Sequence, residues 1–354
     1  MRSRLPGARW AWYEHREEGR AARCFDARVL DLPTRRDMPH KATLSPSTKQ
    51  DLQGIKDGYL LMQPRRLGVL LNESRCAYSY AMADELDLAA SSRGVELEYL
   101  PVAWAGVQEE ADQNDLLHLL EHTKQFDGLV ILSSVFNHNV KSLKRFTQTW
   151  WPRPASSIGF RLPLVPSVLV DNRRAMYTAT RHLITEHNRS KIVFIRGRSD
   201  SQEATDRYFG FRQALRESNI LGDSARVLEG DFTRQSAVAE LSRLSRAIDF
   251  DAVLASNDEM ALAVVTELEA RGLRIPEQVS VIGFDDVPAA SKGRVALTTM
   301  RQPFDLVAQK AIELVLDQCE EAHVSTISEV PVQFIHRASC GCGVKKSLAA
   351  ERLA

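Results

Sequence analysis

The sequence has few cysteines, no long apolar run and no excess of either charge. Its five cysteines are scattered and odd in number, which is typical of a reducing compartment rather than of a disulfide-stapled secreted domain. No apolar stretch reaches the about 18 residues of a membrane span, and the Arg-rich N-terminus has no apolar run of signal-peptide length. Lys plus Arg and Asp plus Glu are equal at 46 each. We therefore expect a cytoplasmic protein without a membrane partner.

The sequence also lacks the short motifs of common enzyme classes. It contains no Gly-x-Ser-x-Gly nucleophile elbow and no Gly-rich phosphate loop. Its nine histidines are scattered, and none accompanies the polar strand ends described below. Cys340-Gly341-Cys342 is shorter than the usual spacing of zinc ligands, and no second pair is apparent. We therefore expect no enzyme activity, no cofactor and no metal.

From about Leu67 onward, short apolar runs alternate with helical patterns. Continuous apolar runs separated by helices are typical of parallel strands buried on both faces. Between the last two runs, apolar residues at helical spacing predict a helix that Asn257 or Asp258 would cap. The predicted class is α/β with doubly wound sheets, and 354 residues suffice for two lobes. The runs are residues 67–71, 95–100, 128–132, 167–170, 191–195, 251–256 and 279–284.

Two regions depart from this alternation. Residues 150–157, WWPRPASS, interrupt it near the middle of the chain, which suggests a second unit beginning soon after. Residues 1–43 show no periodicity and hold nine arginines, so poorly ordered or irregular structure is expected there. Residues 1–66 hold 14 Lys or Arg against 8 Asp or Glu, and the remaining chain 32 against 38. A basic head on an acidic body is compatible with an anionic partner for the head or with a solvated tail.

Two neighbouring predicted strands end in polar pairs, Asn257-Asp258 and Asp285-Asp286. Ligands of open parallel sheets bind beyond the carboxyl ends of the strands, where amide and carboxylate groups can bind hydroxyls or amines. An Asx residue at such a junction also commonly caps the next helix. We assign the capping role to Asp258 and Asp286, and leave both roles open for Asn257 and Asp285.

Three longer stretches resemble the sensor core of lactose- and galactose-repressor-type regulators, the LacI/GalR family. They are VPSVLVDNRRAMYTATRHLITEHNRSKIVFIRG, ATDRYFGFRQALRESNI, and residues 253–286 followed by LTTMRQPFDLVAQKAIELVL. The resemblance covers about residues 66–340 and implies a periplasmic-binding-protein-like fold of type I. Two Rossmann-like lobes would enclose an effector in the cleft between them. The expected lobes comprise about residues 66–162 plus 303–324 and about 163–302 plus 325–340, followed by a tail, 341–354.

The resemblance also implies roles for individual residues of the second lobe. Arg207 in ATDRYFGF matches the family's arginine that reaches the effector, although a surface helix arginine is the plain alternative. Phe232 in EGDFTRQS matches an aromatic residue that stacks on the effector, with core packing as its alternative. Asn257 and Asp285 match polar contacts to the effector, in agreement with their predicted place at the strand ends.

Three further residues complete the expected site. Gln302 in TTMRQPF matches a weaker pocket position at a lobe crossover, and Tyr78 is the candidate from the first lobe, in the loop 72–80. Many family members have an Asp-Arg pair before a crossover, whereas SIGFR here keeps Arg161 without the acid. Arg161 and Arg207 near one cleft would favour an acidic or phosphorylated effector over a neutral sugar. The expected partner is therefore a sugar, a sugar acid or a phosphorylated metabolite.

The DNA-binding head of the family is only partly recognisable. LSPSTKQDLQGIKDGYL at residues 44–60 resembles the third headpiece helix, but its two preceding helices cannot be found in residues 1–43. Seven residues separate Tyr59 from Leu67, which leaves no room for the usual hinge helix. We expect residues 1–65 to be a divergent or partly disordered remnant of the head. The resemblance implies a ligand-responsive transcriptional regulator that binds operator DNA as a homodimer through its sensor core. The alternatives are a free-standing sensor and a signalling-protein sensor module without DNA binding.

Overall fold

A computed structural model of the chain describes residues 64–72, 76–102, 111–136, 140–220, 225–244, 249–322 and 324–342. Residues 44–60, the expected remnant of a headpiece helix, lie outside these described residues. The same holds for nearly all of the region 1–65 and for most of the expected tail. Among the described helices, none combines the length and the apolar character that a membrane crossing requires.

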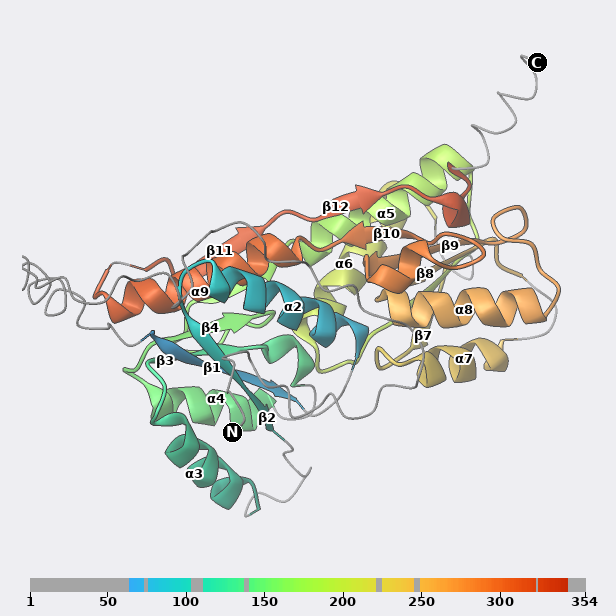
Figure 1. Ribbon diagram of the computed structural model, residues 1–354. Coiled ribbons are helices and arrows are strands. Elements are labelled where there is room, and N and C mark those ends of the chain that lie inside the picture. Colours follow the sequence, from blue (N-terminus) through green and yellow to red (C-terminus); the bar gives the residue numbers. More distant parts are fainter. Residues whose placement is uncertain are drawn as a thin grey trace, which may run out of the picture. The chain divides into compact units, whose positions relative to one another are not determined.

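The first lobe is built on a parallel sheet of six strands in the order β11-β5-β4-β3-β1-β2 (Figure 1). Its buried cluster includes Leu70, Phe126, Ile131 and Ile312. Its helices are α2 (Ala77–Ser91), α3 (Ala111–Thr123), α4 (Val140–Trp150) and α9 (Phe304–Cys319). Its strands are β1 (Arg66–Asn72), β2 (Glu96–Val102), β3 (Gly128–Ile131), β4 (Ala155–Ile158), β5 (Ser167–Val170) and β11 (Ile327–Val330).

The second lobe is built on a second six-stranded sheet, in the order β12-β10-β9-β8-β6-β7. All its neighbouring strands are parallel except β12, which runs antiparallel to β10. Its helices are α5 (Asn172–His187), α6 (Gln202–Glu217), α7 (Arg234–Arg243) and α8 (Asp258–Ala270). Its strands are β6 (Ile192–Arg196), β7 (Ala225–Glu229), β8 (Ala252–Ala255), β9 (Ser280–Asp285), β10 (Thr298–Arg301) and β12 (Gln333–Ile335).

The apolar runs of the sequence follow from burial on both faces of these sheets. In β6, Val193 and Ile195 belong to the cluster that includes residues of α7 and α8. The alternate residues Ile192 and Phe194 belong to the cluster formed with α5 and α6. Since both faces are covered by helices, the buried residues 192–195 of this strand are all apolar. Each of the seven predicted runs contains or overlaps a strand, so the predicted α/β class is confirmed.

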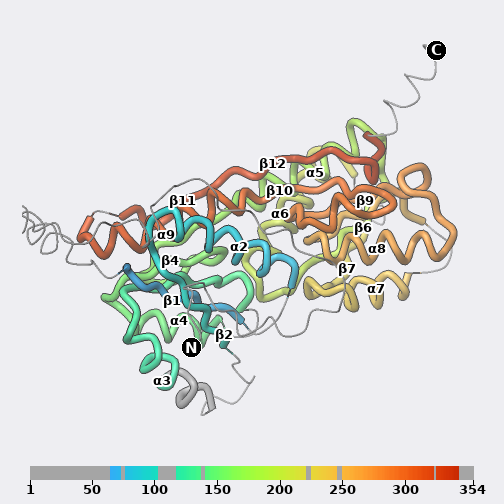
Figure 2. Tube along the Cα trace, viewed as in Figure 1, coloured from blue at the N-terminus to red at the C-terminus, as the bar shows by residue number. Residues whose placement is uncertain are grey.

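The chain passes between the two sheets after β5, after β10 and after β11. The tube in Figure 2 shows β11 and β12 following one another from the first sheet to the second. The expected lobe boundaries at 162/163 and 324/325 are wrong by one strand, because β5 and β11 pair in parallel within the first sheet. Residues 150–157 precede the last central strand of the first sheet, and the second sheet begins after β5. They end α4 and begin β4, which pairs with β3.

Helices α5 and α6 pack closely at Gly210, where a Cβ atom would lie 2.1 Å from the Arg173 carbonyl oxygen. It would also lie 2.9 Å from the Tyr177 backbone nitrogen. We expect Gly210→Ala to lower the free energy of unfolding by about 1–3 kcal/mol, since the two helices must separate to admit the methyl group. Urea denaturation followed by circular dichroism measures this change. Arg216→Ala, on the exposed face of the same helix, is the control. Equal midpoints for the two variants would contradict the close packing.

Candidate functional site

A cavity of about 190 Å³ lies between the lobes, beyond the carboxyl ends of β8 and β9. This volume is far larger than one ordered water requires, so the cavity admits a small molecule. The N-terminal end of α2, which carries Tyr78, points toward the second lobe (Figure 2). The cavity brings together six of the seven residues expected from the sequence. These are Tyr78, Arg207, Phe232, Asn257, Asp285 and Gln302.

Arg207 is held rigidly at the wall of the cavity by α6. Its side chain is 3% exposed, and its Nε donates to Asn172 Oδ1 at 2.7 Å. Its Nη1 donates to the Ser256 carbonyl, and its guanidinium lies 3.7 Å from the ring centroid of Phe284. Glu203, one helical turn earlier, places a carboxylate oxygen 3.9 Å from Nη2. These contacts fix the planar group in one orientation, which suits directional recognition of a ligand oxygen.

Asp285 ends β9 and turns its carboxylate into the cavity. Its Oδ1 accepts a hydrogen bond from Gln302 Nε2 at 2.7 Å, which joins the end of β9 to the crossover after β10. Burial raises the pKa of Asp285 to about 7, although the nearby Arg207 charge and the Gln302 bond lower it. Asp285 and Asp286 both adopt positive φ, at 113° and 63°. Such backbone strain in non-glycine residues is common where a ligand site requires a particular side-chain direction.

Asn257 organises the loop that carries Phe232. Its Oδ1 accepts from the Met260 backbone N–H at 3.0 Å and so caps α8, while its Nδ2 donates to the Phe232 carbonyl at 2.9 Å. Phe232 has a φ of 73°, and its ring covers Gly197, where any Cβ would collide with the ring at 2.2 Å. The aromatic ring at the cavity wall therefore depends on both Asn257 and a glycine.

The capping roles assigned to Asp258 and Asp286 are wrong. Asp258 is fully buried in the first turn of α8, where its carboxylate accepts from Thr299 Oγ1 at 2.6 Å and from the Val287 N–H at 3.0 Å. Asp286 instead forms ion pairs with Arg301 and Arg337, each at 2.6 Å. Asn257 precedes the helix with an extended backbone, so its side chain, and not that of Asp258, reaches the free N–H groups.

Tyr78 is the first-lobe counterpart of these groups. Its hydroxyl accepts a hydrogen bond from Ser134 Oγ at 3.2 Å, and its ring meets Phe304 edge to face, with centroids 5.5 Å apart. Burial raises the pKa of Tyr78 well above its usual value, so the phenol stays protonated and can donate to a ligand. Residues from both lobes therefore present polar groups to the same space.

Arg161 does not share this space. Its side chain is exposed and lines a second cavity, together with Lys144, Asp171 and Asp206. An acidic or phosphorylated effector was expected because Arg161 and Arg207 would share one cleft, and in the structure they line different cavities. Arg161 follows β4 at a sharp turn after Gly159, whose φ is 107°, and this turn directs the following residues away from the cavity around Arg207.

The sequence reasoning missed the acidic residues of the cavity. Glu203, Asp231 and Glu259 line it beside Asp285, whereas Arg207 is the one Lys or Arg among the described lining residues. Burial raises the pKa of Glu203 and of Glu259. A spacing signal existed for Glu203, since it precedes Arg207 by four residues on one helix. The excess of carboxyl groups disfavours anionic ligands.

The comparisons with known proteins agree with this architecture. A family model described as a periplasmic binding protein-like domain matches residues 180–340. The HTH-type transcriptional repressor PurR of Vibrio atlanticus (strain LGP32) is 25% identical over 284 residues, covering 78% of this chain and 81% of the relative. PurR of Aliivibrio salmonicida (strain LFI1238) is 31% identical over 202 residues, covering 56% and 60%.

Solved structures show the same fold. The transcriptional regulator CelR in complex with cellobiose is 26% identical, with a TM-score of 0.66 over 84% of this chain and 91% of that chain. The lac repressor dimer bound to operator has a TM-score of 0.67 over 84% and 99%, and at 22% identity it shows the fold alone. The paired sheets, the crossovers and these relatives lead to one assignment. Residues 180–340 match a periplasmic binding protein-like domain, and the chain is similar to transcriptional regulators of the LacI/GalR type.

Proposed function

We propose that the chain is a transcriptional regulator that binds a small effector between its lobes and couples this binding to DNA binding. The observation that carries the proposal is the cavity, in which Tyr78 of the first lobe faces Arg207 and Asp285 of the second. A ligand that contacts both lobes favours their closed arrangement in proportion to its differential affinity for that arrangement. The names of the relatives, which are transcriptional repressors rather than enzymes, support the same function.

The effector that the cavity favours is an uncharged molecule with several hydroxyl groups, such as a sugar. Asp285 accepts hydrogen bonds, the protonated Tyr78 donates them, and Arg207 donates in a fixed direction. The Phe232 ring offers an apolar face on which a sugar ring can stack. Related structures contain ribose and cellobiose. A sugar acid or sugar phosphate would meet four carboxyl groups and one arginine, and its charge would be poorly balanced.

Calorimetric titration tests this preference with ribose, cellobiose, gluconate and glucose 6-phosphate as probes. We expect a neutral sugar to bind and the two anions to bind at least about tenfold more weakly, a difference of about 1.4 kcal/mol. Preferential binding of gluconate or glucose 6-phosphate would contradict the electrostatic argument. It would restore the earlier interpretation of an acidic effector.

Coupling to DNA is tested by fluorescence anisotropy in a salt series. The full chain and a truncated chain starting at Arg65 would be titrated onto duplex DNA from upstream of the gene and onto a scrambled duplex. We expect tight binding by the full chain alone, and only to the first duplex, as for a head that reads bases. Weak binding to both duplexes that falls steeply with salt would indicate a basic tail. The function would then be that of a free-standing sensor or a signalling module.

We also propose that the sensor core forms a homodimer, as the lac repressor does in its operator complex. Two-fold symmetry would place two N-terminal regions on one operator. Sedimentation of the truncated chain starting at Arg65 distinguishes a core dimer from dimerisation through the first 64 residues.

A further inference from the structure

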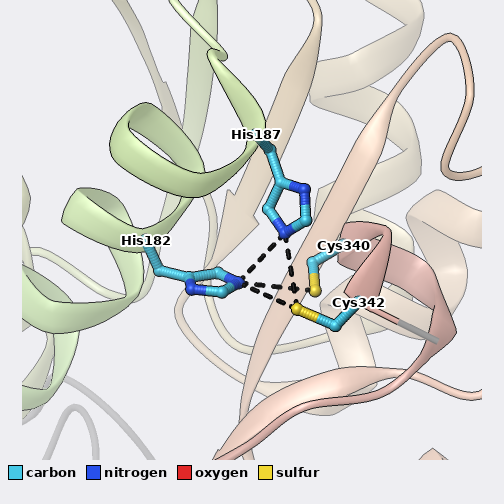
Figure 3. Close-up of side chains that lie close together, drawn as sticks. All are labelled: His182, His187, Cys340 and Cys342. Atoms are coloured by element: carbon cyan, nitrogen blue, oxygen red, sulfur yellow. Dashed lines mark hydrogen bonds between the residues drawn. The ribbon is translucent and has the colours of Figure 1, made fainter. Parts of the chain in front are cut away.

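Four side chains with metal-binding atoms converge where the C-terminal segment meets α5 (Figure 3). His182 lies in α5 and His187 ends it, whereas Cys340 and Cys342 lie at the end of the short helix η4 (Ala338–Cys340) and just after it. The two histidine Nε2 atoms are 3.1 Å apart. Cys342 Sγ lies 3.3 Å from His182 Nε2 and 3.5 Å from His187 Nε2. Cys340 Sγ lies 3.7 Å from His182 Nε2.

Four of the six separations are close to the edges of a tetrahedron around one ion, and all four donor atoms lie within 4.8 Å of one another. With zinc bonds of about 2.0–2.1 Å to nitrogen and about 2.3 Å to sulfur, tetrahedral ligands lie about 3.3 Å (N–N), 3.6 Å (N–S) and 3.8 Å (S–S) apart. The four separations of 3.1, 3.3, 3.5 and 3.7 Å lie within a few tenths of these edges. A hydrogen bond between the two rings explains one contact. It does not explain why two sulfur atoms converge on the same point.

The Cys-Gly-Cys turn is shaped to present both sulfur atoms together. Gly341 has a φ of 109°, and a Cβ there would lie 3.1 Å from His187 Nδ1. A side chain there would strain the backbone and crowd the histidine ring beside it. Two hydrogen bonds also join the turn to β9. Ser339 Oγ donates to the Val281 carbonyl at 2.6 Å, and Ser280 Oγ donates to the Cys340 carbonyl at 3.1 Å. The two cysteines are thus positioned without the help of an ion.

We propose that His182, His187, Cys340 and Cys342 form a Zn²⁺ site that fastens the C-terminal segment to α5. Two nitrogen and two sulfur ligands in tetrahedral geometry select zinc over the oxygen-preferring Mg²⁺ and Ca²⁺. Binding would release the two thiol protons, and two thiolates would then balance the charge of the ion, which suits a partly buried position. Four protein ligands leave no place for a reactive water, so the site is structural.

The site stands apart from the effector cavity. Among the described residues that line the cavity, none belongs to the cluster of two histidines and two cysteines. The ion would cross-link α5 to the end of the segment that begins at β12, two parts of the chain about 150 residues apart. Zinc should therefore stabilise the second lobe while leaving effector affinity unchanged.

Metal analysis of the full chain, purified without chelator under reducing conditions, is the first test. We expect about one zinc ion per chain. After removal of zinc, titration with Co²⁺ should give the intense visible bands of tetrahedral cobalt and a thiolate-to-cobalt charge-transfer band. Absence of bound zinc combined with absence of these bands would overturn the proposal, and so would a stable Cys340–Cys342 disulfide detected by mass spectrometry in reducing buffer.

Cys342→Ser and His187→Gln each remove one zinc ligand at a partly exposed position. Both variants should therefore still fold, so that their zinc binding can be measured. Each should weaken zinc binding by more than the about 10–100-fold that loss of an outer partner costs. Each should also lose the zinc-dependent rise of the melting temperature. The matched controls are Cys319→Ser and His118→Gln, which lie in the first lobe. Unchanged zinc affinity and cobalt spectra in both ligand variants would show that any bound ion lies elsewhere, and the proposal would fall.

Discussion

Replacing Arg207 with Met should lower the free energy of unfolding by about 3–5 kcal/mol. The arginine is 3% exposed and donates to Asn172 and to the Ser256 carbonyl, which would both lose their donor. The buried Glu203 would also lose its nearby positive charge. Urea denaturation measures the loss. Arg212→Met, an exposed arginine on the same helix, should change stability by no more than about 0.5 kcal/mol.

A second substitution distinguishes the contribution of the Arg207 charge to stability from that of its packing contacts. In the Arg207→Met background, Glu203→Gln should restore part of the stability, because it removes the carboxylate that has lost its partner. In the wild-type background the same change should be unfavourable or neutral. Additive effects of the two substitutions would mean that Arg207 acts through its hydrogen bonds and its stacking on Phe284 alone. Arg207→Lys keeps the charge without the planar fork, and should therefore lose effector affinity more than stability.

Asp285→Asn should weaken the binding of a neutral sugar to the cavity by at least about a hundredfold, or about 2.7 kcal/mol. The charged acceptor makes stronger hydrogen bonds to ligand hydroxyls than an amide does. The fold should persist, since an asparagine oxygen can still accept from Gln302. Titration calorimetry with the sugar that binds the wild-type chain measures the change. Asp84→Asn, at an exposed position of α2, is the control.

The pH dependence of binding should distinguish a ligand-binding carboxylate from a structural one. The pKa of Asp285 is raised to about 7, so its charge changes near neutral pH. Sugar affinity in the wild type should then rise as pH increases through about 7, and should be flat in Asp285→Asn. A flat profile in the wild type would show that the carboxylate does not contact the sugar in its charged form.

The raised pKa of Asp285 also affects folding stability, which should fall as pH rises, whereas sugar affinity should increase. A folded-state pKa above the unfolded value means that the folded chain binds this proton more tightly. The stabilising contribution is complete below about pH 4 and is lost as pH rises through about 7. The unliganded wild type should therefore lose stability relative to Asp285→Asn across this window. Urea midpoints of the two chains at several pH values measure the difference.

Much of the fold was determined by local sequence. Residues 192–195 and 252–255, within the runs KIVFI and DAVLAS, are all apolar, as a strand covered on both faces requires, so β6 and β8 were predicted closely. Strands β4 and β10 were missed because buried Ser and Thr interrupt the apolar pattern. Ser157 Oγ donates to Ser133 Oγ, and Thr299 Oγ1 donates to Asp258, so these polar groups find partners far along the chain that the local pattern does not reveal.

The site was determined in part by sequence and in part by tertiary structure. The resemblance identified Arg207, Phe232 and Asp285, because strand ends and the following turns keep their order along the chain. Arg161 was misplaced, because the direction of a side chain after the turn at Gly159 depends on backbone geometry that spacing does not reveal. The sheet to which β5 and β11 belong was equally undetermined, because a buried parallel strand has the same pattern in either sheet.

The cluster of His182, His187, Cys340 and Cys342 could not be predicted from the sequence. In sequence, Cys340-Gly341-Cys342 has no neighbouring ligand pair, and two histidines five residues apart do not share a helix face. His187 reaches the same point as His182 because it ends α5, where the backbone turns into the left-handed Asn188. The sequence by itself determined the alternation of strands and helices, since burial acts on each short segment. Only the tertiary structure decided which distant side chains meet, since that depends on crossovers and helix ends.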